Sequence, residues 1–141
     1  MRSLGLDIGD KRIGVALSDS EGILASPFTV INRTDESRDI EAIIDIINQR
    51  QVGRVIVGLP RSMNGSLGKQ ADKVKEFTQK LCSYTQVPLE YRDERLTTVL
   101  AERLARAVKT KKTRERVGHD AQAAAIILQG YLDEEREPNS P

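Results

Sequence analysis

The chain has 141 residues, of which 38% are hydrophobic and 30% charged, and its formal net charge is +1. This length suits one domain with a real core, and so small a net charge excludes a protein whose bulk charge alone attracts nucleic acid. The lone cysteine, Cys82, excludes a disulfide framework and favours a reducing compartment. No secretory leader or membrane-length apolar run is present, so we expect a soluble cytoplasmic protein.

The first quarter of the chain predicts three strands joined by short links. Residues 2–9 and 12–19 read as two strands around a tight turn at Asp10 and Lys11. Turn-forming residues at 19–22 separate them from a third extended run at 23–31. Consecutive strands with links this short form an antiparallel meander.

After residue 33 the pattern alternates between helices and strands. Helices are predicted from apolar residues that recur every three or four positions, and a buried strand from a continuous apolar run. The expected elements are a helix capped by Thr34 or Asp35 and running to Ile47, a strand at 52–60, a helix at 67–81, a strand at 87–94, a helix from Thr97 or Thr98 to Val108, and a helix from about Asp120 to Leu132. This order predicts an α/β fold with a mixed five-stranded sheet, built as a three-strand meander and two βα crossovers with helices on both faces. We expect one domain at 1–133 and a disordered polar tail at 134–141.

Asp7 is the first acidic residue in an unusual place. It lies in the first predicted strand on the same face as Gly5 and Gly9, where the glycines leave room for another group to approach the backbone. A carboxylate inside a sheet is costly unless it is paired or binds a metal. The alternative is an acid that closes the hairpin, but Asp10 already lies in that turn. We therefore favour a functional role for Asp7.

Two further acidic positions follow the same logic. Asp93 and Glu94 end the fifth predicted strand, and ligands of open α/β sheets gather at the carboxyl ends of parallel strands. Strand alternation points only one of these two at a site, and the sequence does not choose between them. Asp120 precedes an alanine-rich helix and shares the face of Ala124 and Leu128. The alternative is that the acid only interacts favourably with the helix dipole at the N-terminus.

These acidic residues favour hard-metal chemistry. One histidine and one cysteine cannot supply a Ser-His-Asp set, a thiol protease or a zinc site. Carboxylate oxygens instead favour Mg²⁺ or Mn²⁺, and a pair of such ions roughly 4 Å apart cleaves phosphodiesters. Of the acids, we expect Asp7, Asp120 and one of the strand-end pair to bind the metals; we take Glu94 as the third ligand, although the sequence does not choose it over Asp93.

Four segments resemble the YqgF (RuvX) family of RNase H-like nucleases. They are LGLDIGDKRIGVALSD, VGLPRSMNGSLGKQA, DERLTT and DAQAAAIILQGYL, which occur in the family's order between residue 3 and about 133. The resemblance implies an RNase H-like fold, a cytoplasmic location and a role in maturing the 5′ end of the 16S ribosomal RNA precursor. The family's catalytic acids correspond to Asp7, to Asp93 or Glu94, and to Asp120. His119 stands where the family usually has an aliphatic residue, and we interpret it as a bystander rather than a helper in proton transfer.

The resemblance also gives the basic residues a purpose. Between Arg103 and Arg116 there are seven basic residues and a single acid, which taken alone is a common solvated surface. Beside the proposed metals, the segment 109–116 would be a mobile stretch that contacts phosphates without reading the sequence. The residues expected to bind nucleic acid are Lys11, Arg61, Arg95, Lys109, Lys111, Lys112, Arg114 and Arg116.

Three functions stay open on the sequence alone. The favoured one is an endonuclease on structured RNA, namely the 16S precursor. A resolvase of four-way DNA junctions is the second, and it would need two active sites, hence a dimer; the sequence does not choose between a monomer and a homodimer. The third is a nucleic-acid-binding ribosome-assembly factor that does not cleave. The sequence shows no aromatic platform for base stacking, so it does not tell an RNA substrate from a DNA substrate.

Overall fold

The computed structural model describes residues 1–60, 68–93 and 112–136, and for residues 112–119 and 136 it describes the backbone alone. The described elements, in chain order, are β1 (Arg2–Ile8), β2 (Arg12–Ser18), β3 (Ala25–Asn32), α1 (Glu36–Gln49), β4 (Val52–Leu59), α2 (Lys69–Cys82), β5 (Leu89–Asp93) and α4 (Lys112–Arg136). The helix predicted to end at Val108 lies outside the described residues.

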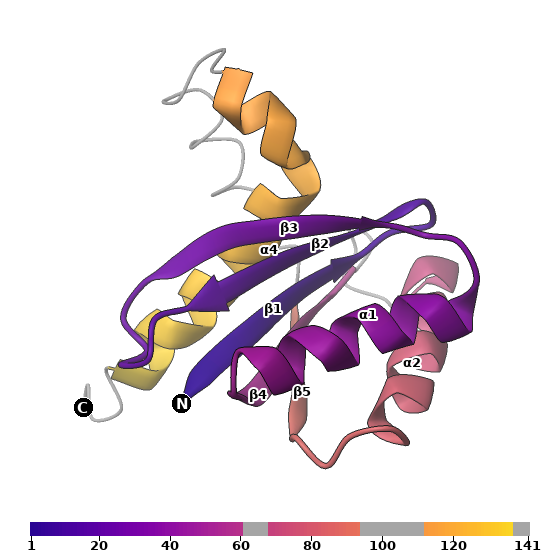
Figure 1. Ribbon diagram of the computed structural model, residues 1–141, viewed down its shortest axis with the longest axis horizontal. Coiled ribbons are helices and arrows are strands. Elements are labelled where there is room, and N and C mark those ends of the chain that lie inside the picture. Colours follow the sequence, from indigo (N-terminus) through magenta and orange to yellow (C-terminus); the bar gives the residue numbers. More distant parts are fainter. Residues whose placement is uncertain (61–67, 94–111, 137–141) are drawn as a thin grey trace.

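The five strands form one mixed sheet in the order β3-β2-β1-β4-β5. β1, β2 and β3 pair antiparallel, whereas β4 and β5 continue the sheet parallel to β1. The predicted five-stranded α/β sheet is therefore confirmed, with the meander on one side of β1 and the two crossover strands on the other (Figure 1).

Helix α1 begins where the sequence predicts it. The side chain of Asp35 accepts a hydrogen bond of 2.9 Å from the backbone nitrogen of Arg38, so Asp35 rather than Thr34 caps the helix. Such a cap satisfies a backbone N–H that has no partner within the helix. Ile40, Ile43 and Ile47 are then buried on one face of α1.

Helices α1 and α2 cover one face of the sheet and enclose the larger core. Leu4, Leu6 and Ile8 of β1 point into this core, where they pack with residues of both helices. Phe77 and Leu81 of α2 are among its fully buried side chains. The core is aliphatic almost throughout.

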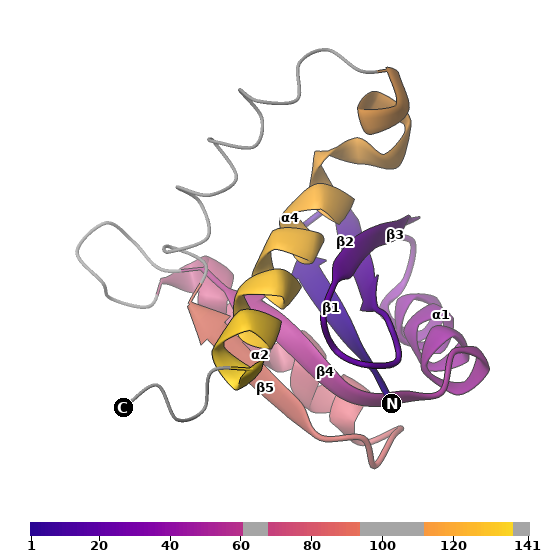
Figure 2. The same ribbon diagram turned by 90° about the vertical axis from the view of Figure 1, so that its left-hand side faces the viewer.

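Helix α4 crosses the opposite face of the sheet, away from α1 (Figure 2). It begins at Lys112, not near Asp120 as predicted, and it continues to Arg136, three residues into the predicted tail. Its orange N-terminal turns and its yellow body run in different directions (Figure 1). The prediction placed the helix start too late because the apolar repeat begins only at Ala121, whereas the preceding Lys, Arg and Glu residues are themselves good helix formers.

Polar contacts fasten the second half of α4. Gln129 accepts from the backbone nitrogen of Ala25 at 2.8 Å and donates to the carbonyl of Ile23 at 2.9 Å. Arg54 of β4 donates to the hydroxyl of Tyr131. Burial raises the pKa of that hydroxyl above its ordinary value, although the neighbouring guanidinium acts in the opposite direction.

None of the described helices has a stretch long and apolar enough to cross a membrane.

Candidate active site

The backbone of α4 rests directly on a glycine of β2. A Cβ atom on Gly14 would overlap the carbonyl oxygen of Asp120 and lie 2.9 Å from the nitrogen of Ala121. Likewise, a Cβ atom on Gly5 of β1 would lie 2.9 Å from the carbonyl oxygen of Ala124. Any larger residue would push the helix away from the sheet. The glycines around Asp7 thus admit a close neighbour, and that neighbour is α4 itself.

This contact brings two of the predicted acids to one place. Asp7 is paired with Gly14 in the β1–β2 ladder, and paired residues of a ladder point to the same face. Since the missing side chain of Gly14 would point at α4, Asp7 faces α4 as well. Asp120 lies above Gly14 and its side chain is 31% exposed, while Asp7 is half-buried. The two carboxylates therefore gather under α4 at the carboxyl end of β1.

Arg12 joins this pair, and our sequence analysis did not identify it. Its Nε donates to Oδ2 of Asp120 at 2.9 Å, across 108 positions of the chain. Arg12 lies two residues from Gly14 on β2 and so shares its face. That alternation could have placed Arg12 on the same face as Asp7, but nothing in the sequence indicates its partner.

The strand-end acids separate by strand alternation. Asp93 is paired with Leu59, which lies in the core beneath α1 and α2. Tyr91, two residues earlier, hydrogen-bonds Thr78 of α2 on that same face. Asp93 therefore belongs to the α2 face, away from Asp7 and Asp120. Glu94 lies outside the described residues.

The basic residues expected to bind nucleic acid divide into three groups. Lys11 is exposed in the β1–β2 turn, next to Arg12. Lys112, Arg114 and Arg116 lie in the first turns of α4, so this part of the segment 109–116 is helical, where the sequence predicted no helix. The remaining four, Arg61, Arg95, Lys109 and Lys111, lie outside the described residues. His119 is also in α4, with only its backbone described.

A second unpredicted arginine supports the β1–β2 turn. Arg33 donates from Nη1 to the carbonyl of Gly9 at 2.8 Å and from Nε to Oδ2 of Asp39 at 3.2 Å. The Asp39 side chain is only 3% exposed, and the Arg33 guanidinium lies 4.9 Å from the centre of the Phe77 ring. This network ties the residues just after Asp7 to α1 and α2, so it holds the end of β1 in place.

The donors fit a hard divalent cation. Asp7 and Asp120 supply carboxylate oxygens, which Mg²⁺ and Mn²⁺ prefer. In the described part of the chain no three His, Cys, Asp or Glu side chains come together, and Glu94, the predicted third donor, lies outside that part. The arrangement of two acids is therefore compatible with the predicted metal site.

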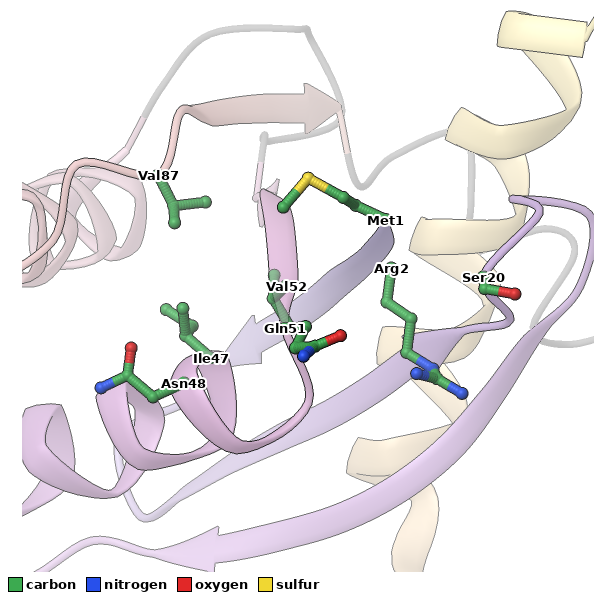
Figure 3. Close-up of a pocket in the computed structure, with 8 residues that line it drawn as sticks. All are labelled: Met1, Arg2, Ser20, Ile47, Asn48, Gln51, Val52 and Val87. Atoms are coloured by element: carbon green, nitrogen blue, oxygen red, sulfur yellow. The ribbon is translucent and has the colours of Figure 1, made fainter.

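A separate hollow of about 580 Å³ lies at the other end of β1. Figure 3 shows its lining, which includes Arg2 at the start of β1, Ile47 of α1 and Val52 at the start of β4. Asp7 lies at the carboxyl end of β1, so this hollow is not part of the carboxylate site.

An antiparallel meander continued by two parallel strands, with acids at the end of the first strand and on the last helix, defines a domain of the RNase H-like class. The fold is similar to that of RuvC from T. thermophilus, solved in complex with a Holliday junction substrate. The TM-score is 0.66 at 15% sequence identity, and 96% of each chain is covered.

The family model RuvX, described as Holliday junction resolvase, matches residues 1–134, and the chain belongs to this family. A relative from Trichormus variabilis is 47% identical over 131 residues, covering 93% of this chain and 87% of the relative. Another, from Thermoanaerobacter pseudethanolicus, is 45% identical over 137 residues, covering 96% and 99%. Both carry the name "Putative pre-16S rRNA nuclease". The family resemblance seen in the four sequence segments is thereby confirmed.

Proposed function

We propose that this protein is a metal-dependent endonuclease that processes the 5′ end of the 16S ribosomal RNA precursor in the cytoplasm. The observation that carries the proposal is the contact of α4 on Gly14, which brings Asp120 to the face and strand end that hold Asp7. Membership of the RuvX family and the name shared by the two relatives support the nuclease class and the RNA substrate.

Asp7, Glu94 and Asp120 would hold Mg²⁺ or Mn²⁺, with two ions expected. When bound, such ions lower the pKa of a water molecule and stabilise the leaving oxygen of a phosphodiester. Asp7 is suited to this task because it lies in a strand whose end is held by Arg33 through Gly9. A rigid strand keeps a ligand in the geometry that the reaction needs.

The basic residues would position the substrate. Lys11 lies in the turn beside the carboxylates, and Lys112, Arg114 and Arg116 precede Asp120 on the same helix. With Arg61, Arg95, Lys109 and Lys111 they would neutralise backbone phosphates, which fixes a nucleic acid in place without reading its bases. A small net charge is compatible with this role because the sequence gathers seven basic residues and a single acid between Arg103 and Arg116.

A resolvase acting on four-way DNA junctions is the second candidate. The description of the family and the junction complex of the structurally similar RuvC favour it. Symmetric cleavage of a junction requires two sites, so this function predicts a stable dimer in solution. A nucleic-acid-binding assembly factor that does not cleave is the third possibility, and it predicts that loss of Asp7 has no effect.

The test is cleavage of a 5′-extended 16S precursor and of a four-way DNA junction, side by side, with Mg²⁺ or Mn²⁺. We expect the wild type to cleave the RNA and Asp7→Asn to lose roughly 100-fold or more, since even the outer partners of metal ligands are worth about 10- to 100-fold. Asp45→Asn, an exposed acid on α1, is the matched control and should cleave like the wild type.

Each other outcome selects a different function. Cleavage of the junction alone would establish the resolvase. Equal cleavage by wild type and Asp7→Asn, or none by either, would contradict the catalytic role of Asp7 and favour the binding factor.

The adjacent pair Asp93 and Glu94 gives an internal comparison. Because Asp93 belongs to the α2 face, we expect Glu94→Gln to reduce cleavage at least roughly tenfold more than Asp93→Asn, the lower end of what such site residues are worth. The opposite ranking would show that the strand end turns after β5 and that Asp93 is the metal ligand.

A further inference from the structure

Three charged side chains surround Gly14. Asp120 lies above it on α4, Asp7 is opposite it on β1, and Arg12 lies two residues along β2 on the same face. In an antiparallel ladder, Asp7 and Arg12 are diagonal neighbours, within reach of a long side chain. The guanidinium of Arg12 is bonded to Oδ2 of Asp120 at 2.9 Å.

The exposure of the two partners is unequal. The Arg12 side chain is 54% exposed and that of Asp120 31%. A half-exposed ion pair is weak, because water screens its charges and the long arginine side chain loses freedom in forming it. The ion pair between Arg12 and Asp120 is therefore weak enough for a competing ion to displace it.

We propose that Arg12 is a reversible counter-ion of Asp120: it offsets the charge of that carboxylate when no cation is bound, competes with the divalent cation for Asp120, and is released to bind a substrate phosphate. The idea rests on the proposed function, because it assumes that Asp7 and Asp120 bind the cation. It adds a coupling between cation binding and substrate binding through one named side chain.

Electrostatics supplies the direction of this coupling. Two carboxylates on one face repel each other, and a nearby guanidinium reduces that repulsion. A divalent cation held by these acids would do the same with more charge, and the guanidinium would then be a repulsive neighbour of that cation. Arg12 stands at the start of β2, beside the exposed turn with Lys11, where a planar guanidinium can bind two phosphate oxygens.

The first experiment measures Mn²⁺ binding to the full chain without nucleic acid, by the loss of the electron paramagnetic resonance signal of free Mn²⁺. We expect Arg12→Gln to bind Mn²⁺ roughly threefold to fivefold more tightly, the scale of a half-exposed ion pair that no longer competes. Arg12→Lys keeps the charge and should lie closer to the wild type. Arg38→Gln is the matched control, since Arg38 forms an exposed pair of 3.5 Å with Asp35 on α1.

The outcomes separate this inference from the proposed function. If Arg12→Gln binds Mn²⁺ as the wild type does, or more weakly, Arg12 is not a competitor and the inference is wrong, while the nuclease proposal stands. If Asp7→Asn binds Mn²⁺ as well as the wild type, the cation site lies elsewhere and both ideas fail.

The second experiment measures binding of a 5′-extended 16S precursor at several salt concentrations, with Ca²⁺ or with a chelator. With Ca²⁺, Arg12→Gln should bind more weakly, and its salt slope should fall by about one, as for the loss of one phosphate contact. With the chelator the slope should be unchanged, because Arg12 is then held by Asp120. The same change under both conditions would show that Arg12 binds phosphate independently of the cation and would overturn the coupling.

Discussion

The two faces of the sheet are covered in different ways. On the α1 and α2 face, branched and aromatic side chains such as Leu6, Ile43 and Phe77 fill the space between helix and strand. On the α4 face, Gly5 and Gly14 let a helix backbone touch the strands. Large side chains exclude water and stabilise the fold, whereas small ones bring a helix close enough for its carboxylate to lie beside one on a strand.

Beyond this contact, α4 buries apolar side chains of its own against the sheet, among them Ile127, Leu128 and Leu132. Polar contacts also fasten the helix: Gln129 bonds to the backbone of Ile23 and Ala25, and Arg92 forms an ion pair of 2.7 Å with Glu134. We therefore expect substitutions on the two faces to separate stability from activity.

The largest stability effect is expected on the α1 face. Ile43 is fully buried there, so Ile43→Ala should destabilise the protein by about 2–5 kcal/mol, through lost burial and the cavity left behind. Ile43→Val is the graded control and should cost about 0.5–1.5 kcal/mol. Urea denaturation measures both. Cleavage per folded molecule should stay at the wild-type level, and a loss of activity larger than the loss of folded protein would contradict the separation of the faces.

A smaller stability effect with a larger effect on activity is expected at Gly14. A Cβ atom there overlaps the backbone of Asp120, so Gly14→Ala must displace α4, at about 1–3 kcal/mol for an overpacked contact. Displacing Asp120 by about 1 Å can reduce cleavage about 100-fold. Gly68→Ala is the matched control, because a Cβ atom on Gly68 meets nothing within 4 Å. Equal cleavage by Gly14→Ala and the wild type would show that Asp120 need not lie close to β2.

Much of the fold could be predicted because its signals are local. Asp35 caps α1 by bonding to Arg38, only three residues away. The run 52–59 is apolar because both faces of this strand are covered. The glycine beside Asp7 predicted a close neighbour, although the sequence could not show that the neighbour is the helix that carries Asp120.

The contacts that complete the site could not be predicted. Arg12 bonds to Asp120 across 108 positions of the chain, and Arg33 bonds to Gly9 across 24 positions. Contacts this distant in sequence produce no periodic pattern from which they could be predicted. The face of the sheet on which Asp93 lies follows from its pairing with Leu59, which only the sheet register supplies.

The smallest effect is expected at the turn to which α4 is fastened. The Asp19 carboxylate accepts hydrogen bonds from the backbone nitrogens of Ile23 at 2.7 Å and Leu24 at 3.1 Å, and these bonds lower the pKa of Asp19 below its ordinary value of 3.8. A pKa lowered by folding means that the carboxylate stabilises the folded state fully above the unfolded value, and that this contribution is lost as the pH falls through the folded value. Asp19→Asn should therefore lower the urea midpoint slightly near neutral pH, and the gap to the wild type should close below the unfolded pKa. Asp45→Asn is the control for a change of net charge. A difference in urea midpoint that stays constant with pH would show that the turn does not depend on the charge of Asp19. The hydrogen bonds of Gln129 to Ile23 and Ala25 would then not depend on that charge either.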